Sequence, residues 1–107
     1  EGSPDGMTLD KNKNLWVAHF HGACVSVFNI RAKLIHRIHL PAKNITNCTF
    51  GGLKNNEVFI TSATKGMNRA DLQKFKYSGF LFSIKSNIKG INQKKFILKN
   101  AKKRSLL

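Results

Sequence analysis

Acidic residues are scarce in this sequence. Five Asp and Glu stand against 19 Lys and Arg among 107 residues, which gives a formal net charge of +14. Such an excess of positive charge attracts nucleic acid or an anionic membrane surface. The lysines, however, are scattered from Lys11 to Lys103, and no nucleic-acid motif accompanies them. We therefore attribute the positive charge to compositional drift and expect no nucleic-acid partner.

Cysteine, proline and long apolar runs are equally rare. Cys24 and Cys48 have neither CxxC nor CxxH spacing, so the sequence predicts no zinc site and leaves a disulfide undecided. No apolar run approaches the ~20 residues of a membrane span. The chain begins at Glu1 without a basic-then-apolar leader. We expect an internal or C-terminal piece of a longer cytoplasmic protein, with no membrane partner.

What the sequence does contain is a series of short runs rich in aromatic and β-branched residues, separated by polar turns. Four such runs come first, at residues 7–10, 15–20, 24–29 and 34–40. Strands of this length at about ten-residue spacing predict an antiparallel meander. Three further runs follow, at residues 47–50, 57–62 and 79–84, with a longer loop at 65–78.

The strand pattern repeats. Thr8 corresponds to Thr49 and Trp16 to Phe59, which are offsets of 41 and 43 residues. A repeat of about 40–45 residues with four strands indicates a β-propeller blade. We expect an all-β fold with one blade at 1–41, a last blade lacking a strand at 42–99, and a basic tail at 100–107. The alternative is a stand-alone β-sandwich, with residues 7–10 and 47–50 in facing sheets.

Pro4-Asp5-Gly6 predicts a tight turn before the first strand, because proline restricts φ and glycine permits a positive φ. Asp5, at the apex of this turn, is placed to face a ligand. Aspartate is also a common turn residue whatever the function. Asp10, beside the Lys11–Lys13 turn, is expected to be solvated and dispensable.

Several motifs occur in one order along the chain: Glu1-Gly2-Ser3-Pro4-Asp5-Gly6-Met7, Asn14-Leu15-Trp16-Val17-Ala18, Cys48-Thr49-Phe50-Gly51-Gly52, Ile60-Thr61-Ser62-Ala63 and Lys89-Gly90. In this order and spacing they resemble the family of regucalcin (senescence marker protein) and gluconolactonases. The resemblance implies a six-bladed β-propeller, of which this chain is the C-terminal portion. It also implies hydrolysis of a sugar lactone with one divalent cation, calcium or zinc, with magnesium or manganese used by some members.

The resemblance gives Asp5 two roles, metal ligand and general base. The family's Glu and Asn ligands and its sugar-contacting Arg lie upstream of this motif, so we expect no activity from these residues without the remaining blades. Asn47, Cys48 and Ser62 are weaker candidates for lining the substrate site. The alternative function is a non-catalytic propeller that binds a partner, such as a polyanion, through its basic surface.

Overall fold

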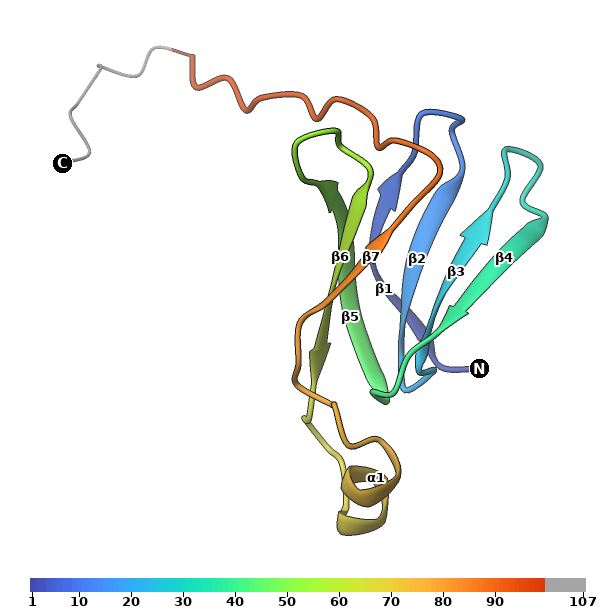
Figure 1. The fold of residues 1–107 in the computed structure, drawn as a ribbon, viewed down its shortest axis with the longest axis vertical. Coiled ribbons are helices and arrows are strands. Elements are labelled where there is room, and N and C mark those ends of the chain that lie inside the picture. Colours follow the sequence, from blue (N-terminus) through green and yellow to red (C-terminus); the bar gives the residue numbers. More distant parts are fainter. Residues whose placement is uncertain (100–107) are drawn as a thin grey trace, which may run out of the picture.

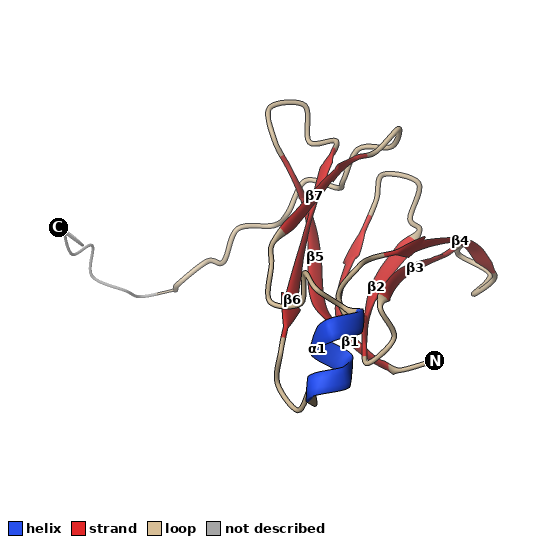
Figure 2. Ribbon diagram, turned by 60° about the horizontal axis from the view of Figure 1, so that its bottom comes forward, coloured by secondary structure: helices blue, strands red, loops and turns tan. Residues whose placement is uncertain are grey.

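The computed structural model describes residues 1–99, and the predicted basic tail at 100–107 lies outside them. Two antiparallel sheets and one short helix make up the described part (Figures 1 and 2). The first sheet has the order β1 (Ser3–Leu9), β2 (Leu15–Phe20), β3 (Cys24–Phe28) and β4 (Leu34–His39). The second has the order β5 (Asn44–Gly51), β6 (Glu57–Ala63) and β7 (Phe82–Lys85).

The two sheets confirm the predicted pair of meanders, one with four strands and one with three. Trp16 lies opposite Thr8 in the first sheet, and Phe59 lies opposite Thr49 in the second. The repeat read from the sequence is therefore a repeat of cross-strand pairs. β1 and β5 lie side by side and run in the same direction (Figure 1). This is how the inner strands of neighbouring blades are arranged, and it differs from the facing sheets of a sandwich.

The hydrophobic core lies between the two sheets. Alternate side chains of each strand point into it, as the period of a strand requires. The rings of Trp16 and Phe50 make a T-shaped contact with 5.1 Å between their centroids, which joins the sheets near the end of β5. The buried core residues are Trp16, Ala18, Val25, Val27, Leu40, Ala42, Ile45, Cys48, Val58 and Ile60.

The long connection between β6 and β7 carries the helix α1 (Arg69–Lys74), inside the predicted loop. The Asn68 side chain caps this helix by accepting a hydrogen bond from the Asp71 N–H. β7 begins at Phe82 and not at residue 79, because the Gly79 N–H donates to the Ser62 hydroxyl outside the strand ladder. No helix within residues 1–99 is long and apolar enough to cross a membrane.

The predicted Pro4-Asp5-Gly6 turn is wrong, because these residues belong to β1. Pro4 lies opposite His19 and Met7 lies opposite Val17, so β1 accommodates one residue more than β2 between these pairs. That extra residue makes a β-bulge, which bends a strand without ending it.

Antiparallel pairing puts alternate loops of each meander at the same end of the molecule. The β1–β2, β3–β4 and β5–β6 hairpins, residues 10–14, 29–33 and 52–56, lie together at what we name the hairpin end (Figure 1). The start of β1 and the helix α1 lie at the opposite end, which we name the helix end (Figure 1).

Candidate functional site

Asp5 lies in the bulge of β1, at the helix end, and its side chain is exposed. β5 has a bulge of its own, where the register shifts between Ile45 and Asn47. The two bulges are 41 residues apart, so each blade distorts its inner strand at the same position. Because β1 and β5 lie side by side, the two bulges are neighbours. Bulges of this kind redirect side chains away from the regular pleat.

Close packing joins the two bulges. A Cβ atom on Gly6 would overlap the Asn47 side chain, so only glycine fits beside this amide. Asn47 is exposed, and its Oδ1 atom accepts one hydrogen bond, from the Cys48 N–H at 2.9 Å. A carbonyl oxygen has two lone pairs, so Oδ1 retains one acceptor site. The structure thus brings the predicted residues Asp5 and Asn47 into one neighbourhood.

Thr46 is a residue of this region that sequence reasoning missed. It occupies the β5 bulge, and its hydroxyl is 2.7 Å from the Thr61 hydroxyl on β6. Its position one repeat after Asp5 was visible in the sequence. The bulge that makes the two positions equivalent could not be seen in the sequence, because a bulge depends on how two strands pair.

The other two predicted lining residues are engaged within the protein. Cys48 is 3% exposed, its thiol donates to the Trp16 carbonyl at 3.7 Å, and burial raises the pKa of that thiol to about 11. The Ser62 hydroxyl accepts from the Gly79 N–H and donates to the Phe80 carbonyl, which fixes the loop after α1. Both cysteines are buried free thiols, so no disulfide joins them.

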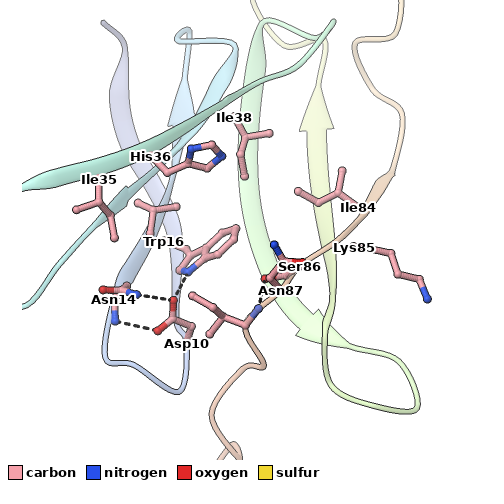
Figure 3. Close-up of a pocket in the computed structure, with 12 residues that line it drawn as sticks. Asp10, Asn14, Trp16, Ile35, His36, Ile38, Ile84, Lys85, Ser86 and Asn87 are labelled. Carbon is pink, nitrogen blue, oxygen red and sulfur yellow. Dashed lines mark hydrogen bonds between the residues drawn. The ribbon is translucent and has the colours of Figure 1, made fainter.

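Asp10 contradicts the expectation of a solvated, dispensable carboxylate, because it is fully buried. Its Oδ1 accepts from the backbone N–H groups of Asn12 and Asn14, at 2.8 and 3.0 Å. Its Oδ2 accepts from Asn14 Nδ2 and Trp16 Nε1, both at 2.9 Å (Figure 3). Burial acts to raise the pKa of Asp10, but these hydrogen bonds outweigh it and hold the pKa below its ordinary value. Asp10 thus organises the β1–β2 hairpin and orients the core tryptophan.

A cavity of about 290 Å³ lies beside Asp10, between the outer strands of the two sheets (Figure 3). Its walls are mostly apolar and include Trp16, Ile38 and Ile84. Asp5 is not among the residues that line it. The cavity is therefore a feature of the packing between the blades, separate from the bulge region.

A metal ion in a protein is held by several side chains that lie close together. No group of three or more His, Cys, Asp and Glu residues within residues 1–99 could hold a metal ion. The only ion pair among those residues joins Lys43 to Asp71 at 2.7 Å, and the Asp5 carboxylate has no such partner there. Carboxylate and amide oxygens are the kinds of ligand that a hard cation takes. Asp5 and Asn47 carry one such group each.

Comparison with known sequences gives the family. The family model described as "SMP-30/Gluconolactonase/LRE-like region" matches residues 1–64. "Putative sugar lactone lactonase YvrE" of Bacillus subtilis is 42% identical over 84 residues, which cover 78% of this chain and 29% of that protein. Regucalcin of Danio rerio is 40% identical over 93 residues, which cover 85% of this chain and 32% of that protein. The chain therefore spans about a third of the length of these relatives.

Comparison with solved structures gives the architecture. A calcium-binding protein, regucalcin of Agrobacterium tumefaciens, matches with a TM-score of 0.84 over 92% of this chain and 33% of that one, at 22% identity. A luciferin-regenerating enzyme matches with a TM-score of 0.75 over 85% of this chain and 31% of that one, at 29% identity. The two sheets thus correspond to a portion of a regucalcin propeller. The family match over more than half of the chain and this shared fold show that the chain belongs to the SMP-30/gluconolactonase/regucalcin family.

Proposed function

We propose that the protein containing this chain hydrolyses a sugar lactone with one bound divalent cation, and that Asp5 is both a metal ligand and the general base. The observation that carries the proposal is the exposed Asp5 carboxylate, which has no ion-pair partner in residues 1–99 and lies in a bulge whose next residue, Gly6, packs against Asn47. The family and its gluconolactonase and lactonase members support the reaction class. The activity belongs to the whole protein, since this chain spans about a third of its relatives.

Asp5 and the Oδ1 atom of Asn47 would hold the cation together with ligands from residues outside this chain. Oxygen ligands favour calcium, magnesium or manganese, and a carboxylate also suits zinc. When bound, the cation supplies Lewis-acid polarisation of the lactone carbonyl.

The chain's own contribution to the chemistry is a proton acceptor. The Asp5 carboxylate takes a proton from the water that attacks the lactone carbonyl carbon. The bond between that carbon and the ring oxygen breaks, Asp5 gives the proton it took from water to the ring oxygen, and the product is the open hydroxy acid. The bulge fixes Asp5 on a strand, which holds the base in place better than a mobile loop would.

Substitutions of Asp5 in the full protein test this proposal. Asp5→Ala removes a ligand and the base together, so lactone turnover is expected to fall by about 10³-fold or more, with weaker metal affinity. Asp5→Asn keeps one oxygen ligand and loses the base, so it should retain more metal affinity than turnover. Lactone hydrolysis followed during a metal titration separates the two effects.

Asp71→Asn is the matched control, because Asp71 is a partly buried carboxylate at the same end, with a side chain 22% exposed and Lys43 as its partner. The control should keep parental turnover and metal affinity. Near-parental turnover in Asp5→Ala would refute the assignment of this residue. Steep loss of partner binding with salt and no lactone turnover would favour a propeller that only binds.

A further inference from the structure

The fold gathers basic residues that are scattered along the sequence. Lys11 and Lys13 lie in the β1–β2 hairpin, Arg31 and Lys33 in the β3–β4 hairpin, and Lys54 in the β5–β6 hairpin. All five are exposed, and all belong to the hairpin end (Figure 1). Alternate loops of an antiparallel meander necessarily share one end, so the pairing of the strands creates this cluster.

The acidic groups nearest this basic cluster are already engaged. Asp10 is fully buried, and its carboxylate accepts four hydrogen bonds. Glu57, at the start of β6, accepts a hydrogen bond from the Ser83 hydroxyl. The positive charge of the hairpin end is therefore available to a partner.

Two of the same hairpins carry an aliphatic side chain beside a basic one. Ile30 precedes Arg31 and is 76% exposed, while Leu53 precedes Lys54 and is fully exposed. Propeller blades pack face to face, so a neighbouring blade covers strand faces and leaves the loops at strand ends open. These two side chains would consequently stay exposed in a complete ring.

Internal hydrogen bonds fix the shape of these hairpins. The Asn29 Oδ1 atom accepts from the N–H groups of Arg31 and Lys33, both at 3.0 Å. The Asn55 N–H donates to the Gly52 carbonyl at 3.2 Å in the β5–β6 hairpin. A surface that is ordered before binding loses little conformational entropy when it meets a partner.

The chain after β7 adds the same combination of side chains. Residues 91–99 leave from the hairpin end (Figure 1) and include Lys94-Lys95-Phe96-Ile97-Leu98-Lys99. Phe96, Ile97 and Leu98 are all largely exposed. An apolar run between lysines continues the pattern of the hairpin tips.

We propose that the hairpin end docks on an anionic lipid membrane surface, with Ile30 and Leu53 entering the interface and the basic side chains contacting lipid phosphates. This proposal replaces the expectation of no membrane partner, which rested on lysines that are scattered in the sequence but share one end of the fold. Exposed aliphatic residues surrounded by basic ones are the combination that interfacial binding uses. A single-stranded nucleic acid would call for several aromatic stacking residues, but the three hairpins contain none and residues 91–99 contain one, Phe96. Asp5 is the third residue of β1, which begins at the opposite end (Figure 1), so docking leaves that region open to solvent.

Co-sedimentation of the full protein with lipid vesicles tests the proposal. Binding is expected to vesicles of phosphatidylcholine that contain one third phosphatidylserine, and not to phosphatidylcholine alone. Lys54→Gln should weaken the affinity by about five-fold, since one basic residue near the surface is lost. Leu53→Ser should weaken it by about ten-fold, because an aliphatic side chain no longer leaves water.

The helix end supplies the matched controls, Leu72→Ser and Lys74→Gln, which alter an exposed leucine and an exposed lysine on α1. They should bind the anionic vesicles as the parent does. Equal loss of binding in the controls would overturn the assignment to the hairpin end. Parental binding by Leu53→Ser, together with salt-sensitive binding of duplex DNA, would replace the membrane by a soluble polyanion. Neither result bears on lactone hydrolysis, which is assayed separately.

Discussion

The clearest structural prediction concerns Asp10, whose replacement should destabilise the protein strongly. Asp10→Ala leaves three buried donors without an acceptor: Asn14 N, Asn14 Nδ2 and Trp16 Nε1. A buried donor left unpaired costs about 1–3 kcal/mol. Because such costs are not additive within one network, we expect the free energy of unfolding to fall by about 4 kcal/mol. Chemical denaturation of the full protein measures this change.

Asp10→Asn sharpens the test, because it preserves the shape of the side chain. One oxygen can still accept from the N–H groups of Asn12 and Asn14, but an NH₂ group now faces the Trp16 Nε1 donor. We expect about half of the loss seen with alanine, roughly 2 kcal/mol. Asp71→Asn is again the control, since the Asp71 side chain is 22% exposed whereas Asp10 is fully buried. Equal unfolding of Asp10→Ala and the parent would refute the structural role of Asp10.

The contribution of Asp10 has a defined pH dependence. Its hydrogen bonds hold the folded-state pKa below the ordinary value, so the ionised carboxylate contributes stability above the unfolded pKa. That stability is lost as the pH falls through the lower, folded pKa. The stability difference between the parent and Asp10→Asn should stay constant at neutral pH and shrink only below about pH 4. A difference that disappears near neutral pH would contradict this assignment.

Two further predictions concern the contact between the blades. Gly6→Ala adds a Cβ atom that overlaps the Asn47 side chain, so it should lower the free energy of unfolding by about 1–3 kcal/mol and weaken metal binding by the full protein. Denaturation and a metal titration measure the two effects, and a variant as stable as the parent would refute the close packing. Cys48, with a pKa of about 11, should resist alkylation near pH 8 in the folded protein of a Cys24→Ser variant and react once the protein is denatured. Rapid labelling of the folded protein would show that the thiol is accessible.

The alternation of short apolar runs determined most of the fold from the sequence by itself. Strand patterning and the repeats of 41 and 43 residues predicted two antiparallel meanders, and the cross-strand pairs of Trp16 and Phe59 confirm both. The motif around Asp5 led to the family, which the comparisons confirm. The metal and catalytic roles of Asp5 stay predictions.

Only the tertiary structure decided which polar side chains are exposed and which are buried. Asp5 and Asp10 are five residues apart, yet Asp5 on β1 is exposed, whereas Asp10, just after β1, is fully buried and accepts hydrogen bonds from Asn14 and Trp16. The pairing of β1 with β2 creates both the bulge and the Trp16 contact, and pairing cannot be read from local propensity. Strand pairing likewise brought Lys11, Arg31 and Lys54 to one end, although the sequence separates them by many residues. Local patterns specify strands, whereas the partners of a side chain depend on which strands meet.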